Sequence, residues 1–257
     1  IFMYEYLHRI LGRIIGIIFF IPLLYFTLRK AIPPVLIPRL YLLLILGGFQ
    51  GVLGWYMVKS GLVDDPNVSQ YRLTAHLGMA VFIYSLILWT VFDLSLNYNH
   101  AIRSRIKWMS STLTLLIFLM ILSGGLVAGT RAGIPFPTWP LMGDTFIPPQ
   151  IYSMNPSWLS AFEDMATIQF NHRMFAYLLT IFIVIFAIVL LGSNVPRFLK
   201  NGTTVLLFVL SLQVVLGIST LLFYIPIPVA AAHQVGAIAL LSVSLFITHS
   251  CLSREQI

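Results

Sequence analysis

The sequence contains few charged residues. Its 257 residues include only 15 Lys and Arg and 8 Asp and Glu, which is 9% of the chain. A soluble domain carries about 25% charged residues, so most of this chain's surface must face something other than water. The scarcity of charge excludes an ordinary water-soluble domain and indicates contact with lipid.

Cysteine is nearly absent as well. The single Cys251 excludes an internal disulfide and a cysteine-based metal cluster. The formal net charge is +7, but the basic residues form neither a run nor a stripe interleaved with aromatic residues. Nucleic acid is therefore not expected as a partner.

Long uncharged segments, in contrast, are abundant. A bilayer core needs about 20 apolar residues of helix. Segments of this length or longer are 40–58, 73–92, 108–130, 174–196 and 201–253. The last is long enough for two helices separated at 225–228, and a further helix is expected from about Glu5 to Leu28. The sequence thus predicts an all-α integral membrane protein with seven transmembrane helices.

The charges between these helices are distributed unevenly. If successive helices alternate in direction, one side, called side B, receives nine of the fifteen basic residues, and Glu255 is the only acidic residue in those loops. The positive-inside rule places side B in the cytoplasm or the mitochondrial matrix. Side A, where the odd-numbered helices begin, then faces the periplasm or the intermembrane space.

Four histidines are expected at one depth near side A, because each lies early in an odd-numbered helix. They are His8, His76, His172 and His233. The remaining two, His100 and His249, are expected to be solvated or interfacial.

The chain also repeats itself. A His-Arg pair, a Gln-x-x-Leu-Gly motif and a further His begin at 8, 50 and 76 and again at 172, 213 and 233. Internal repeats in membrane proteins usually form two bundles with equivalent sites, so we expect one bundle in 1–100 and a second, of four helices, in 101–257. The glycines of these segments, including Gly54 and Gly217, are interpreted as close helix contacts.

Two histidines on facing helices suit a haem. Zinc normally takes a third protein ligand, and a proton relay would extend toward both membrane faces. A haem requires two axial nitrogens, an apolar slot and cations near its propionates. Arg9 and Arg173 directly follow a histidine in each half, and snorkelling to the side A interface is their alternative role.

The halves differ three residues before these His-Arg pairs. Glu5 precedes His8, whereas Gln169 precedes His172, and each shares a helix face with its histidine. A carboxylate beside a haem can accept a proton or stabilise a developing cation, but an amide cannot accept a proton. We therefore predict chemistry in the N-terminal half and electron transfer in the C-terminal half, with a local Glu5–Arg9 ion pair as the alternative.

Several ordered motifs resemble the heme A synthase family across essentially the whole chain. They are Glu5-x-x-His8-Arg9, GGFQGVLGWYMVKSGL at 47–62, SQYRLTAHLG at 69–78, GGLVAGTRAG at 124–133, TWPLMGD at 138–144, FNHR at 170–173, QVVLGISTLL at 213–222 and AAAHQVGAIALL at 230–241.

The resemblance implies an enzyme of eight helices in two four-helix halves, which oxidises the C8 methyl group of heme O to a formyl group and so makes heme A for terminal oxidases. It implies that His8 and His76 hold the substrate haem, that His172 and His233 hold heme b, and that Glu5 takes part in the chemistry. Implied partners are heme O, an electron donor that is ferredoxin-like or a quinol, the heme O synthase that supplies the substrate, and further copies of the chain.

The chain departs from the family pattern in two respects. Seven helices are predicted instead of eight, and the repeat indicates that the first is the missing one. The outer loops 59–72 and 130–167 contain no cysteine, which resembles the cysteine-free class, and the second loop contains six prolines and is expected to form a rigid cover over side A. The motifs favour a bacterial plasma membrane over a mitochondrial inner membrane.

Two other functions are alternatives at this point. A di-haem cytochrome that carries electrons from quinol would usually stack its haems across the membrane, whereas all four histidines here lie toward side A. A transporter with a midplane site between the repeats would require a discontinuous helix or a charge at midspan, and the sequence indicates neither.

Overall fold

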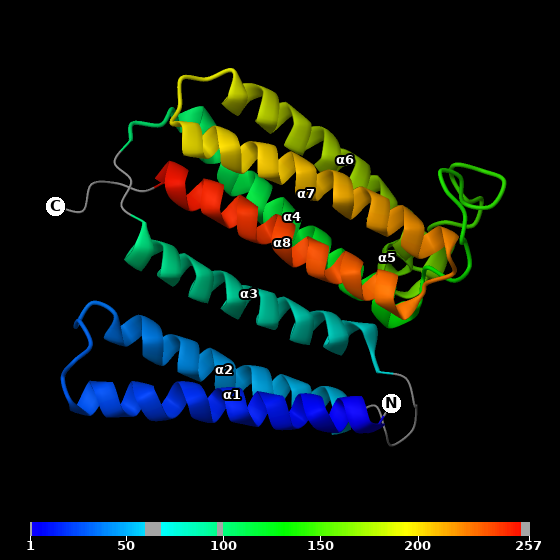
Figure 1. Ribbon diagram of the computed structural model, residues 1–257. Coiled ribbons are helices and arrows are strands. Elements are labelled where there is room, and N and C mark those ends of the chain that lie inside the picture. Colours follow the sequence, from blue (N-terminus) through cyan, green and yellow to red (C-terminus); the bar gives the residue numbers. More distant parts are fainter. Residues whose placement is uncertain (1, 60–67, 97–99, 253–257) are drawn as a thin grey trace.

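A computed structural model describes residues 2–59, 68–96 and 100–252, with the side chains of Phe2, Tyr4, Glu5 and Lys59 outside that description (Figure 1). Within the described residues, seven helices are long and apolar enough to cross a membrane, which agrees with the number predicted from the sequence. These helices are α1 (Phe2–Leu28), α2 (Ile37–Lys59), α3 (Gln70–Ser95), α4 (Ser104–Thr130), α6 (Met165–Leu191), α7 (Arg197–Leu222) and α8 (Ile227–Leu252). The 3₁₀ turn η1 (Ser157–Leu159) and the short helix α5 (Ser160–Glu163) precede α6.

The largest difference from the predicted boundaries is at α6. The uncharged segment begins at Met174, but the helix begins at Met165. Asp164 caps it, because its carboxylate accepts hydrogen bonds from the backbone N–H of Thr167 at 2.8 Å and from the Thr167 hydroxyl at 2.6 Å. Arg173 interrupts the uncharged segment without interrupting the helix.

The helices are arranged as a C-terminal bundle with a three-helix N-terminal part beside it (Figure 1). In the bundle, α4 packs against α6 and α8, and α7 packs against α6 and α8. Helix α3 contacts α4 and α8 on one side and α2 on the other, and α1 packs against α2. Because α3 contacts both parts, the division at residue 100 stays a prediction.

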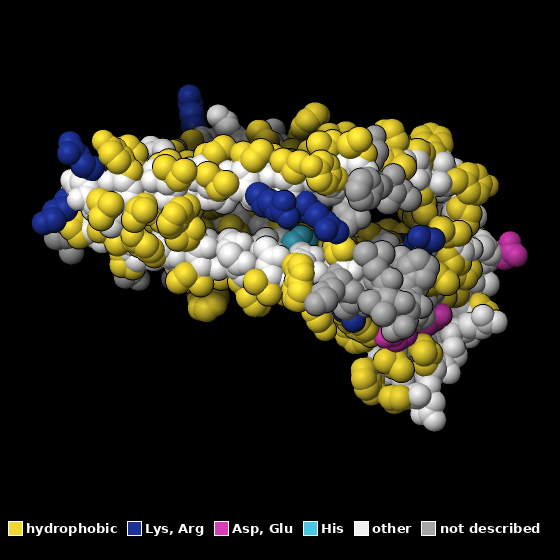
Figure 2. All heavy atoms as spheres, turned by 90° about the horizontal axis from the view of Figure 1, so that it is seen from below, with side chains coloured by type: hydrophobic (Ala, Val, Ile, Leu, Met, Phe, Trp, Pro, Cys, Tyr) yellow, Lys and Arg dark blue, Asp and Glu magenta, His cyan; other side chains and the backbone are white. Residues whose placement is uncertain are grey.

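The buried core lies mainly in the C-terminal bundle. Phe186, Ile183, Leu113 and Leu206 are each 0% exposed. Apolar side chains on α1 remain exposed instead, as at Ile18, and Figure 2 shows hydrophobic side chains along the length of the long helices. Such large exposed apolar surfaces are expected where a protein contacts lipid, so the chain is an integral membrane protein.

The prediction that His249 is solvated or interfacial is wrong. His249 is 3% exposed, its Nε2 lies 2.8 Å from Asp93 Oδ1, and its ring contacts Trp89 and Phe92. Asp93 also forms an ion pair with Arg39 of α2. A buried imidazole is stable here because a carboxylate is its partner. Asp93 lies inside α3, near its side B end, and no repeat or motif marks it in the sequence.

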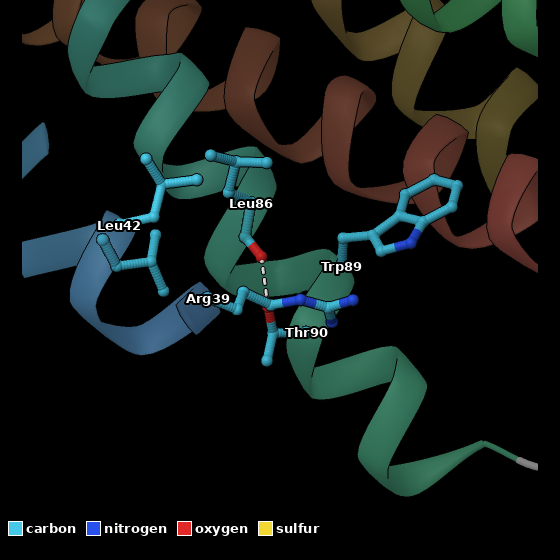
Figure 3. A pocket seen from close by; sticks show the side chains of 6 residues that line it. Arg39, Leu42, Leu86, Trp89 and Thr90 are labelled. Atoms are coloured by element: carbon cyan, nitrogen blue, oxygen red, sulfur yellow. Dashed lines mark hydrogen bonds between the residues drawn. The ribbon is translucent and has the colours of Figure 1, made fainter. Parts of the chain in front are cut away.

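A small cavity of about 170 Å³ lies between α2 and α3 at this end. Its lining is Arg39, Leu42, Leu43, Leu86, Trp89 and Thr90 (Figure 3). The Thr90 hydroxyl donates to the Leu86 carbonyl of its own helix at 2.7 Å. Ligand pockets usually measure about 300–1,000 Å³, so we assign no ligand to this cavity.

Candidate functional site

The four helices that carry the selected histidines, α1, α3, α6 and α8, all begin at the same end of the molecule (Figure 1). His8 of α1 and His76 of α3 lie together there, with ring centroids 6.4 Å apart and an interplanar angle of 64°. Two trans imidazole nitrogens, each about 2 Å from an iron, place the ring centres about 6 Å apart. The observed separation therefore fits a shared haem iron. His8 is exposed and His76 is half-buried.

Helix α2 supports His76. The Gln50 amide donates to the backbone carbonyl of His76 at 3.0 Å and lies 3.4 Å from its ring Nε2. Gly54 follows one turn later, and a Cβ atom at this position would lie 2.9 Å from His76 Cε1. A side chain at position 54 would therefore displace the imidazole.

The second half builds the same support for His233. The Gln213 amide donates to the backbone carbonyl of His233 at 2.9 Å, and a Cβ atom on Gly217 would lie 2.9 Å from His233 Cε1. The repeated Gln-x-x-Leu-Gly motif thus holds one histidine in each half. The prediction that Gly54 and Gly217 lie at close helix contacts is confirmed, and at both positions the facing group on the neighbouring helix is an imidazole.

The two supports share a further property. Nδ1 of His76 and of His233, and Oε1 of Gln50 and of Gln213, are buried and have no hydrogen-bond partner among the described residues. Buried polar atoms without partners are unfavourable. Each support therefore fits a site that a bound group completes.

His172 of α6 is held by α4. Its Nδ1 lies 3.0 Å from the Ser123 hydroxyl, and a Cβ atom on Gly124 would lie 3.6 Å from His172 Cε1, so the ring packs against the α4 backbone. Helix α6, which carries His172, and helix α8, which carries His233, both pack against α4 and α7. The C-terminal pair of histidines therefore lies within one helical bundle.

Arg173 and Gln169 hold the segment that follows α4. Arg173 is 6% exposed, and its Nη atoms donate to the carbonyls of Leu141 at 3.1 Å, Phe136 at 3.0 Å and Thr138 at 2.8 Å. Gln169 is 2% exposed and donates to the Phe136 carbonyl at 3.0 Å. Arg173 Nε alone among the guanidinium nitrogens is buried with no partner in the described chain. The proline-containing segment is therefore fastened to the beginning of α6, as expected of a cover.

The same outer segment also reaches the N-terminal half. Glu163 of α5 accepts hydrogen bonds from Gln70 at 2.8 Å and from the Tyr71 hydroxyl, both on α3. The cover is thus attached to α3 as well as to α6.

The structure gives the amide at position 169 a structural reason. A carboxylate has no proton to donate to the Phe136 carbonyl, so a glutamate would lose this contact. The difference between Glu5 and Gln169 therefore does not by itself identify Glu5 as the chemical group. Position 5 lies in α1, but the Glu5 side chain is outside the described residues. Arg9 is exposed on the same helix.

A groove of about 860 Å³ lies between α2, α3 and α4. Its lining is apolar apart from the hydroxyls of Tyr71, Thr74 and Ser123. Ala75 precedes His76, and Ser123 contacts His172, so the groove borders both histidine sites. Its volume is within the usual range for ligand pockets, about 300–1,000 Å³.

Ser123 is not among the residues predicted from the sequence. The quoted family motif begins one residue later, at Gly124. A long apolar helix with one serine facing a histidine carries no periodic signal. Only the packing of α4 against α6 shows the contact.

Comparison with known proteins agrees with the family resemblance of the sequence motifs. Residues 1–245 match the family described as Cytochrome oxidase assembly protein. The chain is 47% identical to the heme A synthase of Nitrosospira multiformis, with 97% of this chain and 71% of the relative covered. It is 41% identical to that of Parvibaculum lavamentivorans, again with 97% and 71% covered, and 36% identical to that of Wolbachia pipientis wMel, with 100% and 71% covered. The chain therefore belongs to the cytochrome oxidase assembly protein family, and its relatives there are heme A synthases.

Proposed function

We propose that the protein is a heme A synthase, an oxidoreductase that converts the C8 methyl group of heme O to a formyl group. The observation that carries the proposal is the duplicated histidine site. Each half supports one histidine with the same Gln and Gly, and the His8–His76 separation fits an iron. The relatives named heme A synthase support the same reaction.

The two pairs receive different haems. Glu5 precedes His8, whereas Gln169 precedes His172, so the pair of His8 and His76 suits the haem that is oxidised. The pair of His172 and His233 lies among α4, α6, α7 and α8 beneath the outer segment, which suits a resident cofactor. We assign heme O to the first pair and heme b to the second.

Arg9 and Arg173 belong to the propionate edges of these haems. The Nη groups of Arg173 already hold the outer segment, and its buried Nε–H remains as a donor for a propionate oxygen. Arg9 follows His8 as Arg173 follows His172, so it takes the equivalent place in the substrate site.

Glu5 is the proposed catalytic residue. It lies three residues before His8 and hence on the same face of α1. When bound, heme b supplies one-electron transfer. The Glu5 carboxylate accepts a proton or stabilises positive charge at the substrate methyl group as it is oxidised. The oxidation requires an external oxidant, and dioxygen would serve. Two successive hydroxylations of this carbon would each consume one O2, two electrons from the donor and two protons and release one water, giving a geminal diol, which loses water to leave the formyl group.

The membrane placement and partners extend the proposal. The bacterial relatives and the charge distribution support a bacterial inner membrane, with the histidine sites toward the periplasm. A mitochondrial inner membrane is the alternative. A ferredoxin-like protein or a quinol supplies electrons, heme O synthase supplies the substrate, and the chain assembles with further copies of itself.

The test is to extract and identify the haems of the purified protein. Heme O or heme A together with heme b supports the synthase. Two b haems alone would favour an electron-carrying cytochrome, and a protein without haem would contradict both functions.

Glu5→Gln tests the catalytic assignment. It should retain both haems but lose heme A, because the amide cannot accept a proton. Asp144→Asn, which removes an exposed acid from the outer segment, is the control. Unchanged heme A yield in Glu5→Gln would remove Glu5 from the chemistry.

A further inference from the structure

We propose that Ser123 is a positioning residue for His172. Its hydroxyl oxygen accepts a hydrogen bond from Nδ1–H of the imidazole and so directs Nε2 toward the iron of heme b. The inference rests on the proposed function, in which His172 is an axial ligand.

The first support is the direction of the Ser123 side chain. Many hydroxyls of the long helices donate to a carbonyl of their own helix, as Thr130 does to Leu126 at 2.8 Å and Ser85 does to Val81 at 2.8 Å. The Ser123 hydroxyl instead contacts Nδ1 of His172 on a neighbouring helix at 3.0 Å. This contact joins α4 to α6 at the ligand itself.

The second support is the chemistry of imidazole. A neutral imidazole has one N–H, and the other nitrogen then has a lone pair for a metal. Serine provides acceptor lone pairs, so a proton on Nδ1 is stabilised and Nε2 is left to bind iron. Histidines that bind metals almost always donate their second N–H to an acceptor, usually a carboxylate, a backbone carbonyl or water, which fixes the orientation of the ring. The Ser123 hydroxyl oxygen takes this place at His172.

The third support is the packing around Ser123. Gly124 places the α4 backbone against His172, and a Cβ atom on Gly125 would lie 2.9 Å from Thr74 Oγ1 of α3. Helix α4 is therefore held between α3 and α6, with little freedom to withdraw. Thr74 is two residues from His76, so the Ser123–Gly124–Gly125 turn lies between the two histidine sites.

Ser123 also bears on the redox potential of the bound haem. The Gln and Gly supports serve the later histidine of each pair, whereas Ser123 contacts a ring nitrogen of His172 directly. An accepting oxygen on Nδ1–H makes the imidazole a stronger electron donor. It therefore stabilises ferric iron relative to ferrous iron and lowers the midpoint potential of heme b.

Ser123→Ala removes the accepting oxygen. Loss of such a partner typically changes metal affinity about 10–100-fold. If the preference for ferric over ferrous iron falls about tenfold, the midpoint potential rises by about 59 mV for a one-electron couple. The measurement is a redox titration of the heme b absorption in the purified protein, with electron paramagnetic resonance of the ferric state.

Three further variants define the result. Ser123→Thr keeps the hydroxyl and should restore the wild-type potential. Ser123→Cys has a weaker acceptor and should give an intermediate potential. Ser85→Ala removes a hydroxyl that is bonded within its own helix and should have no effect. If Ser123→Ala fails to fold, the ordering of the wild type, Ser123→Thr and Ser123→Cys still decides the proposal.

The inference and the proposed function fail differently. If His172→Ala loses heme b but Ser123→Ala and Ser123→Cys retain the wild-type potential and spectrum, Ser123 has no positioning role and the ligand assignment stands. If His172→Ala retains heme b, or the wild type binds none, the ligand assignment itself is wrong and the inference is overturned with it.

Discussion

Each of the two sites contains a pair of histidines. One histidine of each pair is supported in the same way in both sites, and the other is not. In both, a glutamine holds the backbone of one histidine and a glycine makes room for its ring. The partner histidines differ, because Glu5 precedes His8, whereas Gln169 precedes His172, which contacts Ser123 and lies beside the anchors of the outer segment. The duplicated motif thus supports one histidine in each half in the same way, and we propose that the different surroundings of His8 and His172 determine whether the bound haem is exchanged or retained.

The largest expected effect comes from removing the histidines that differ. His172→Ala should lose nearly all heme b, because one of its two proposed axial ligands is removed. His8→Ala should retain heme b and lose heme A formation, since only the substrate site is changed. Pyridine haemochrome spectra and haem extraction measure both, and His100→Ala, at an exposed position, is the control. Equal loss of heme b from both variants would contradict separate sites.

The next largest effect is expected at the glycine that faces a histidine ring in each half. Gly54→Ala and Gly217→Ala should each weaken haem binding in their own half, because the added Cβ would lie 2.9 Å from an imidazole carbon. Overpacking costs about 1–3 kcal/mol, which is roughly tenfold to hundredfold in affinity. Gly51→Ala, one turn earlier and with open space around the added atom, is the control. If Gly54→Ala depletes heme b as strongly as Gly217→Ala does, the two glycines do not serve separate haem sites.

A smaller effect tests the cover. Gln169→Glu cannot donate to the Phe136 carbonyl and places a carboxylate in a 2% exposed position. The loss of a buried hydrogen bond costs about 1–3 kcal/mol, so the segment 133–149 should exchange its amide hydrogens faster. Gln150→Glu makes the same change at an exposed position of the outer segment and should alter nothing. Unchanged exchange in Gln169→Glu would show that Gln169 is not needed to fasten the segment, which Arg173 and the Trp139–Tyr177 hydrogen bond also hold.

The sequence predicted what is periodic or repeated. The seven apolar helices follow from segments long enough to span a bilayer, and the repeat identified the histidines that the structure brings to one end. Spacing predicted the close helix contacts at Gly54 and Gly217, but it could not show that the facing group is an imidazole.

The rest depends on contacts between helices that are distant in the chain. Ser123 and His172 meet only because α4 packs against α6. Arg173 could be recognised as a cation beside a ligand, but its partners are backbone carbonyls of an irregular segment, and no residue type marks them. Asp93 and His249 are 156 positions apart, so their pairing required the packing of α3 against α8.

The smallest expected effect tests whether the difference between the halves is confined to side A. Asp93→Asn keeps a hydrogen-bonding side chain beside His249 but removes the charge shared with Arg39. Because Arg39 is partly exposed and the amide can still contact the imidazole, we expect a loss of only about 1 kcal/mol of stability, seen as a slightly lower melting temperature. Heme b content and heme A yield should match the wild type, because Asp93 and His249 lie at the opposite end of α3 and α8 from His76 and His233. Asp144→Asn controls for removal of an acid. Asp93→Asn could instead lose either haem at a nearly normal melting temperature. That result would mean that contacts at side B also contribute to the difference between the two histidine sites. The different surroundings at side A would then explain only part of this difference.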